Sequence, residues 1–154
     1  MTEFYLQAAT AAQETAVKNL VRAVQINPLG LDWRRFLVAV DDTGALIGCG
    51  QVKPHGDGSR ELASIAGVRP WRRQGIARAI IQRLQADHAP PLWLTCVSSL
   101  VPFYAQFGFR EVMETAVMPP YFRRVCRLFS LYTRFSSQSD YLAVMVWVNA
   151  DERH

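Results

Sequence analysis

The stretch Arg72-Arg73-Gln74-Gly75-Ile76-Ala77 decides the fold, because it joins a strand-like segment to a helical one. The residues from about Arg60 to Val68 are typical of a strand, and apolar spacing predicts a helix from about Gly75 to Ala86. The first backbone N–H groups of a helix have no partner within it, and the helix dipole is positive there. The stretch therefore predicts an anion-binding turn, which suits a pyrophosphate better than a base edge or a peptide.

The residue types in this turn agree with an anionic ligand. Arg72, Arg73 and Arg78 add positive charge. Gly75 lets phosphates approach the backbone, and Ala77 is nearly as small. A basic, glycine-containing turn can also simply begin a solvated helix, so the interpretation depends on the flanking segments.

Both flanking segments carry further signals. Upstream, Ser64-Ile65-Ala66-Gly67-Val68 is strand-like, and Gly67 within it suggests a bulge or a close backbone approach. Downstream, Phe103-Tyr104-Ala105-Gln106-Phe107-Gly108-Phe109 predicts a short helix that Ser99 can cap and Gly108 can end.

These three segments together resemble the GNAT superfamily of N-acetyltransferases. Its pattern Arg/Gln-x-x-Gly-x-Gly/Ala is matched by Arg72, Gly75 and Ala77. Its Leu-Ala-Val strand end corresponds to Ile65-Ala66-Gly67, and its Phe-Tyr-x-x-x-Gly-Phe helix corresponds to residues 103–109. The order of strands and helices extends the resemblance over nearly all of the chain.

The resemblance implies an α/β (α+β) fold with a mixed, mostly antiparallel central sheet of about six to seven strands, flanked by helices, with a bulged fourth strand. We expect one domain over residues 1–154. Further strands are expected at about Phe4–Ala8, Phe36–Val40, Ala45–Val52, Leu92–Val97, Phe109–Val117 and Tyr141–Val148. Further helices are expected from Thr10 to near Asn27-Pro28 and from Pro119 to about Phe135.

The resemblance also implies acetyl-CoA as co-substrate, with its pantetheine arm in the gap where the fourth strand splays from the fifth. The implied cofactor-binding residues are Ala66, Gly67, Val68, Arg72, Arg73, Gln74, Gly75, Ile76, Ala77 and Arg78, with Ser98 where many relatives have an asparagine. The acceptor amine would attack the thioester directly, without an acyl-enzyme.

Direct attack needs a base for the amine and a proton donor for the thiolate. Glu61 stands where many relatives keep a base, although an exposed strand carboxylate is the alternative. Tyr104 matches the tyrosine that relatives use as general acid, although a core aromatic is the alternative. His55 is the other candidate base, but its glycine-rich turn favours a solvated, mobile histidine, so Glu61 is preferred.

The helix expected at residues 119–135 departs from the simple hairpin of many relatives. Arg123, Arg124, Arg127 and Arg134 give it a positive face. A solvated face over an apolar stripe explains this pattern. It can also be a wall of the acceptor site that prefers acidic acceptors, or a contact in a homodimer.

The composition sets the remaining expectations. A chain of 154 residues with 50% hydrophobic residues and a net charge of +4 suits one compact domain. Cys49, Cys96 and Cys126 lack CxxC spacing, so we expect free thiols in a reducing compartment and no metal site. Without a signal-peptide pattern or an apolar run of about 20 residues, we expect a cytoplasmic protein and no membrane partner.

Three functions from different classes follow. The favoured one is an acetyl-CoA-dependent N-acetyltransferase acting on a primary amine of a small molecule or peptide. The second is an acetyl-CoA-sensing or binding module of the same fold without turnover. The least favoured is a basic nucleic-acid-binding module, because no nucleic-acid motif and no row of exposed aromatic residues accompany the arginines.

Overall fold

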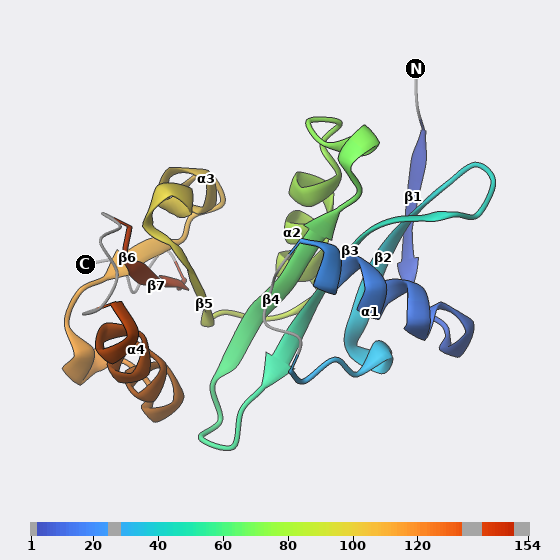
Figure 1. The fold of residues 1–154 in the computed structure, drawn as a ribbon. Coiled ribbons are helices and arrows are strands. Elements are labelled where there is room, and N and C mark those ends of the chain that lie inside the picture. The colour runs from blue at the N-terminus through green and yellow to red at the C-terminus, as the bar shows by residue number, and fades with distance from the viewer. Residues whose placement is uncertain (1–2, 25–28, 134–139, 150–154) are drawn as a thin grey trace. The chain divides into compact units, whose positions relative to one another are not determined.

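The computed structural model of the chain describes residues 3–24, 29–133 and 140–149. Hydrogen bonds link seven described strands in the order β1-β2-β3-β4-β5-β7-β6. Figure 1 labels these strands. The chain groups into two compact units, Met1–Lys53 with Leu62–His88 and Pro54–Glu61 with Ala89–His154. The mixed, mostly antiparallel seven-stranded fold with flanking helices confirms the predicted class. One domain over residues 1–154 stays a prediction.

The strands and the α-helices alternate along much of the chain. In order they are β1 (Phe4–Ala8), α1 (Glu14–Ala23), β2 (Phe36–Asp41), β3 (Leu46–Pro54), β4 (Arg60–Gly67), α2 (Ile76–Asp87), β5 (Leu92–Val97), α3 (Val101–Ala105), β6 (Arg110–Val112), α4 (Pro120–Thr133) and β7 (Leu142–Trp147). Short 3₁₀ turns lie at Ala11–Gln13, Trp33–Arg35, Arg69–Trp71, Ser98–Leu100 and Thr115–Val117.

In the first unit, β1, β2 and β3 form successive antiparallel pairs, and β4 follows β3. The β2–β3 turn is held by the side chain of Asp41. The Asp41 carboxylate accepts hydrogen bonds from the N–H groups of Thr43 at 2.9 Å and Ala45 at 3.0 Å. A carboxylate that binds nearby backbone N–H groups is the usual way in which Asp stabilises a tight turn.

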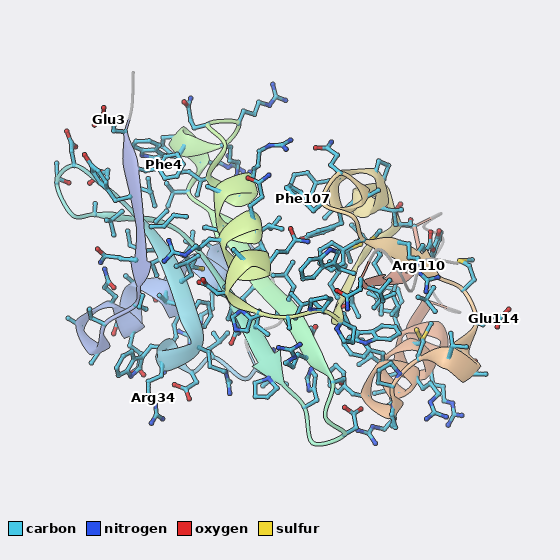
Figure 2. All side chains as sticks on the ribbon, turned by 180° about the vertical axis from the view of Figure 1, so that it is seen from behind. Glu3, Phe4, Arg34, Phe107, Arg110 and Glu114 are labelled. Atoms are coloured by element: carbon cyan, nitrogen blue, oxygen red, sulfur yellow. The ribbon has the colours of Figure 1, made fainter. Side chains whose placement is uncertain are left out.

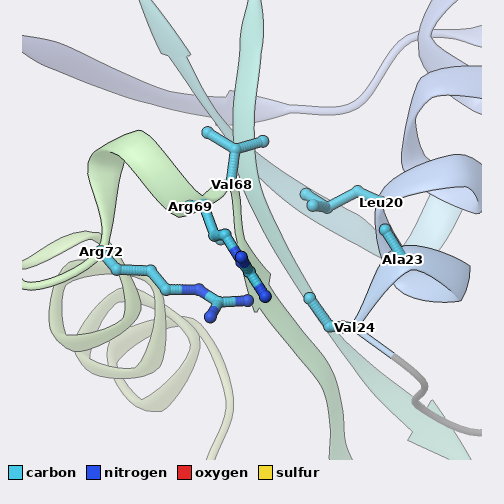
Figure 3. Close-up of a pocket in the computed structure, with 7 residues that line it drawn as sticks. Leu20, Ala23, Val24, Val68, Arg69 and Arg72 are labelled. Carbon is cyan, nitrogen blue, oxygen red and sulfur yellow. The ribbon is translucent and has the colours of Figure 1, made fainter.

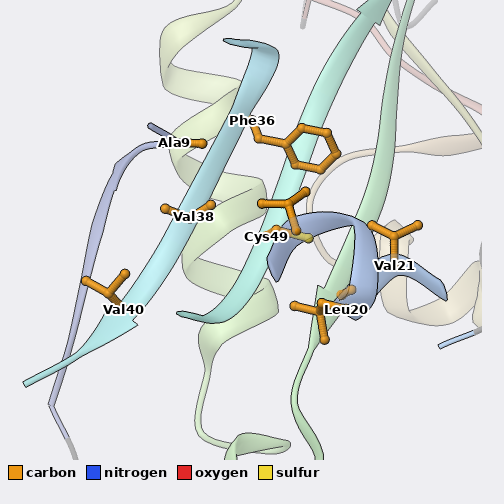
Figure 4. Packing of buried hydrophobic residues seen from close by; sticks show 9 residues of the cluster. Ala9, Leu20, Val21, Phe36, Val38, Val40 and Cys49 are labelled. Atoms are coloured by element: carbon orange, nitrogen blue, oxygen red, sulfur yellow. The ribbon is translucent and has the colours of Figure 1, made fainter. Parts of the chain in front are cut away.

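Helix α1 covers one face of these strands (Figure 4). Just before it, the Thr10 N–H group donates to the side-chain oxygen of Gln13 at 2.9 Å, as part of a capping box. The helix ends at Ala23, before the predicted end near Asn27-Pro28, which lies outside the described residues. Its apolar residues and those of the strands form a buried cluster of Ala9, Val17, Leu20, Val21, Phe36, Val38, Val40, Cys49 and Ala66.

Helix α2 packs against the opposite face through two glycines of β3. A Cβ atom at Gly48 would lie 2.5 Å from Cγ2 of Ile76. One at Gly50 would lie 2.6 Å from Cδ1 of Ile65 and 2.7 Å from Cγ2 of Ile80. Cys49, between the glycines, points to the α1 face because successive side chains of a strand alternate. The small size of the two glycines therefore sets how closely the start of α2 approaches the sheet.

In the second unit, β7 pairs in antiparallel fashion with β5 and with β6, and Glu61 of β4 pairs in parallel with Trp93 of β5. Helix α4 packs its apolar stripe on these strands, and Phe122 is fully buried. The cluster consists of Val112, Met118, Phe122, Val144 and Val146, with Trp93, Tyr121, Cys126 and Val148 packed against it.

Two predicted details are wrong. The strand expected at residues 109–117 is only β6, because Met113 and Val117 are exposed and the chain turns at Thr115–Val117. Ser99 does not cap α3. That helix follows Leu100 without a side-chain cap, because residues 98–100 already form a 3₁₀ turn.

Candidate functional site

The turn before α2 reverses direction through two left-handed residues. Arg73 has a φ of 69° and Gly75 a φ of 83°. Within the helix, the Ala79 N–H group donates to the Gly75 carbonyl at 3.0 Å. The N–H groups of the first helical turn, which come before Ala79, are therefore at the free end of α2. Because nothing lies within 4 Å of the place where a Cβ would stand at Gly75, its left-handed φ is the reason for glycine there.

The start of this turn is held in place by the 3₁₀ turn Arg69–Trp71. The Trp71 N–H group donates to the Val68 carbonyl at 3.0 Å, and the Gln74 N–H group donates to the Trp71 carbonyl at 3.2 Å. The Trp71 ring packs edge-on against Phe4 of β1, which Figure 2 labels, with centroids 6.5 Å apart. These contacts fix the turn through its backbone and its tryptophan.

The arginines of the turn are exposed and carry the charge that the sequence predicts. Arg72 and Arg73 take part in no ion pair among the residues that the structure describes. Gln74, Gly75 and Arg78 are also exposed, Ala77 is half-buried, and Ile76 is buried. Ile76 therefore anchors the helix end on β3, while its neighbours present positive charge and backbone N–H groups to solvent.

A pocket of about 290 Å³ adjoins this turn. It is lined by Leu20, Ala23, Val24, Gly67, Val68, Arg69 and Arg72. Figure 3 shows the guanidinium groups of Arg69 and Arg72 pointing into the space beside Val24. An apolar wall opposite two cations suits a ligand that carries both an anionic group and an apolar part.

The irregularity in β4 lies at Ser64 and not at Gly67, which corrects the expectation for that glycine. A Cβ at Gly67 would meet only the Ile47 carbonyl oxygen at 3.8 Å, an ordinary contact. Ser64 has a φ of 59°, and its hydroxyl accepts a hydrogen bond from Nε2 of the buried Gln51 at 3.0 Å. Gln51 also donates to the Gly30 carbonyl at 3.3 Å. A buried amide thus holds the left-handed serine in the strand.

The two candidate bases, Glu61 and His55, meet in one hydrogen bond. Nε2 of His55 lies 2.8 Å from Oε1 of Glu61, and the side chains are 13% and 8% exposed. The alternative predictions, an exposed carboxylate for Glu61 and a solvated loop histidine for His55, are therefore both wrong. The turn is also not loose. The His55 N–H group donates to the Ser59 carbonyl at 2.9 Å, and the Gly58 N–H group donates to the His55 carbonyl at 3.0 Å.

The start of α4 packs on this pair. The Tyr121 ring stacks on His55 with centroids 3.6 Å apart, and Phe122 meets it edge-on at 5.8 Å. The Tyr121 N–H group donates to the Asp57 carboxylate at 2.9 Å. Hydrogen bonds from the Ser59 hydroxyl, the Tyr121 N–H and the Ser59 N–H lower the pKa of Asp57 to about 2. Asp57 therefore supplies an ionised partner to a backbone N–H group at the start of α4.

Tyr104, the candidate proton donor, lies on α3. Its ring is half-buried against Phe103 at 5.1 Å and Phe109 at 6.2 Å. Burial, with a smaller contribution from Cys96, raises the pKa of Tyr104 to about 12. The hydroxyl therefore keeps its proton at neutral pH, as a hydrogen-bond donor must. The same aromatic contacts also fit the alternative of a packing residue.

The Ser98 hydroxyl is already engaged at the junction of β5 and β7. It donates to Asp140 at 3.2 Å and accepts from the Tyr141 N–H group at 3.2 Å. Its role toward a cofactor stays a prediction.

Residues that sequence reasoning missed are Gln51, Asp57 and Tyr121. Asp57 lies in a recognisable turn, but nothing local in the sequence connects it with α4. Among the described residues, no group of histidines, cysteines and acids could hold a metal ion. No helix in the described part of the chain is long and apolar enough to cross a membrane.

The turn before α2, the Arg69–Arg72 pocket and the order of strands can be compared with known proteins. The pattern of an acetyltransferase (GNAT) domain matches residues 32–111. No curated protein matches the chain. The fold is similar to Rv2747 from Mycobacterium tuberculosis in complex with CoA, at 22% identity and a TM-score of 0.70, covering 94% of this chain and 99% of that one.

Two other solved structures are similar in fold. N-acetylglutamate synthase from Neisseria gonorrhoeae with coenzyme A and N-acetyl-glutamate is 14% identical, with a TM-score of 0.71 over 96% of this chain and 35% of that one. An acyl-CoA N-acyltransferase from Pseudomonas aeruginosa is 17% identical, with a TM-score of 0.64 over 96% of this chain and 100% of that one. Because the pattern covers more than half of its length, the chain belongs to the GNAT acetyltransferase family.

Proposed function

We propose that this protein is an N-acetyltransferase that moves the acetyl group of acetyl-CoA to a primary amine of a small molecule or peptide. The amine attacks the thioester directly in a ternary complex. The observation that carries the proposal is the pair of exposed cations, Arg72 and Arg73, at the free end of α2. Cations and helix N–H groups at one place favour a pyrophosphate.

The pocket beside this turn supports a ligand larger than a phosphate. Arg69 and Arg72 offer charge, while Leu20, Ala23 and Val24 offer an apolar wall. CoA combines phosphates with an apolar pantetheine arm, and two of the similar structures contain CoA. The Gly67 and Val68 backbone, which also lines the pocket, is the proposed contact for part of that arm.

Proton handling is proposed for two places in the second unit. Glu61, together with the His55 ring hydrogen bonded to it, takes up the proton of the ammonium group. The Tyr104 hydroxyl donates a hydrogen bond to the departing thiolate. Because the pKa of Tyr104 is raised to about 12, this hydroxyl stabilises the thiolate as a donor more readily than it surrenders its proton completely.

The test is an acceptor panel with detection of the released thiol and mass spectrometry of the product. The panel contains polyamines, amino acids, aminoglycosides and peptides, and it includes glutamate because one similar structure contains N-acetyl-glutamate. We expect thiol release that depends on one amine class and a product heavier by one acetyl group. Tight acetyl-CoA binding without release for any amine would favour the binding module instead.

The proposed site of action is the cytoplasm. Cys49, Cys96 and Cys126 are free thiols in the structure. Burial raises the pKa of Cys49 to about 12 and that of Cys96 to about 11, so both thiols are unreactive. Three free thiols support a reducing compartment.

A further inference from the structure

The hydrogen bond between His55 and Glu61 fixes how the imidazole carries its proton. Oε1 of Glu61 lies 2.8 Å from Nε2 in a site that is nearly closed to solvent. An ionised carboxylate can only accept, so Nε2 must carry the hydrogen when the ring is neutral. Nδ1 is then the nitrogen with the basic lone pair.

The surrounding elements hold the ring in this orientation. Tyr121 lies nearly parallel to it, with an interplanar angle of 17°, and Phe122 lies nearly perpendicular, at 85°. The His55 backbone is bound on both sides of the turn, to Ser59 and Gly58. Rotation of the imidazole would break the stack and the carboxylate bond together, so several independent contacts fix its orientation.

The other titratable groups around the pair keep their protonation states near neutral pH. In the turn, Asp57 has its pKa lowered to about 2 by hydrogen bonds from Ser59 and Tyr121. On α4, burial and the Glu61 charge raise the pKa of Tyr121. Asp57 therefore stays ionised and Tyr121 stays neutral near neutral pH, so neither of them takes up the proton.

We infer that His55 and Glu61 act as one proton-accepting unit for the acceptor amine, an inference that rests on the proposed function. The resting unit is a neutral imidazole beside a carboxylate, and the loaded unit is an imidazolium paired with that carboxylate. One N–H proton of the ammonium moves to the unit. The freed lone pair forms the new C–N bond, and the C–S bond breaks. The nitrogen then loses its second proton to solvent, and the thiolate, which accepts a hydrogen bond from Tyr104, takes a proton from solvent.

Burial makes a coupled unit more effective than either residue alone. An imidazolium in a nearly closed site is costly unless a carboxylate adjoins it, and Glu61 does so. The carboxylate therefore stabilises the state that follows proton uptake, as an orienting acid does for a histidine base. Glu61 and His55 cannot then make independent contributions to the rate.

A double-mutant cycle on the full chain tests this coupling, with the best amine from the panel. Glu61→Gln and His55→Gln should each lower kcat/KM by about 10²-fold, and the double variant should fall no further than the worse single one. Independent roles predict a loss of about 10⁴-fold in the double variant, and that result would overturn the unit. His88→Gln is the matched control, because the His88 ring bonds to the Leu84 carbonyl at the end of α2.

A measurement without substrate separates this inference from the proposed function. In ¹⁵N NMR of the parent, we expect hydrogen on Nε2 of the neutral His55 ring and none on Nδ1. In Glu61→Gln, the amide can donate as well as accept, so Nε2 need no longer carry the hydrogen and the neutral ring should populate both tautomers. If no amine is turned over, the proposed function fails. The spectrum still shows whether Glu61 holds the hydrogen of His55 on Nε2. Hydrogen on Nδ1 of the neutral His55 ring in the parent would overturn this pairing.

Discussion

The turn before α2 and the cluster around His55 are built on different principles. In the turn, consecutive residues 72–78 present exposed cations and the N–H groups of a helix end. In the cluster, a turn residue, a strand residue and a helix residue (His55, Glu61 and Tyr121) meet in a largely buried group of side chains. The first is a local structure open to solvent, and the second is a long-range structure closed to it.

This difference fits the division of roles that we propose, with ligand binding at the turn and proton transfer at the cluster. A highly charged ligand needs accessible cations and little else, because Coulomb attraction tolerates imprecise geometry. Proton transfer needs a donor and an acceptor within hydrogen-bond distance and in a fixed orientation. Variants of the turn should therefore change affinity, and variants of the cluster should change turnover.

The largest expected effect is on the turn. Arg72→Glu should weaken acetyl-CoA binding by roughly 10³-fold at low ionic strength, because a charge-assisted hydrogen bond is replaced by repulsion. Isothermal titration calorimetry measures the acetyl-CoA affinity of the parent and the variant. Arg124→Glu makes the same charge change on an exposed part of α4 and is the control. Equal affinities for the two variants would show that net charge, not the turn, attracts the ligand.

A smaller effect is expected at Tyr104. Tyr104→Phe keeps the ring contacts with Phe103 and Phe109 and removes only the hydroxyl donor. Turnover should fall by about 10²-fold while acetyl-CoA affinity stays within about twofold. Single-turnover kinetics, in which chemistry limits the rate, provide the measurement. An unchanged rate constant would return this tyrosine to a packing role.

The smallest effect concerns the acid stability of the Asp57 contact. Its folded-state pKa of about 2 lies below the ordinary value near 4, so its stabilisation is complete above about pH 4 and disappears as pH falls toward 2. Asp57→Asn should therefore lower Tm slightly at pH 7, with the difference from the parent shrinking between pH 4 and pH 2. Because Asp57 is exposed, solvent screening limits the effect to a few degrees.

Thermal unfolding followed by circular dichroism measures that difference, with Asp42→Asn in the exposed β2–β3 turn as control. A gap in Tm between Asp57→Asn and the parent that stays constant down to pH 2 would exclude the carboxylate charge as its source.

The local structures of the molecule were predictable from sequence. The turn at 72–77 joins a strand to a helix, and its glycine, its arginines and the apolar spacing around it all lie within one continuous segment. The family resemblance and most element bounds therefore follow from the sequence. The short β6 was overestimated because apolar Met113 and Val117 look like strand residues but remain exposed. The apolar character of a residue does not reveal whether its side chain is buried against other side chains.

The side-chain clusters were not predictable for a related reason. Glu61 and His55 were each proposed as a base, but their hydrogen bond depends on the β3–β4 hairpin register, which a pattern does not specify. Tyr121 reaches His55 from a helix more than sixty positions later in the chain. At Ser64, the buried amide of Gln51 overrides the usual preference for glycine at positive φ.

Gly48 and Gly50 have a consequence for how this protein can change over generations. Any other residue at these two positions adds volume where Ile76, Ile65 and Ile80 already stand less than 3 Å from a Cβ. Substitution there would force these side chains, and the end of α2 with them, away from the sheet. Residues 72–74, in contrast, are exposed and can be exchanged without such displacement. Substitutions at residues 72–74 can therefore change the charge that is presented to a ligand. The two glycines, in contrast, must be kept if the end of α2 is to stay close to the sheet.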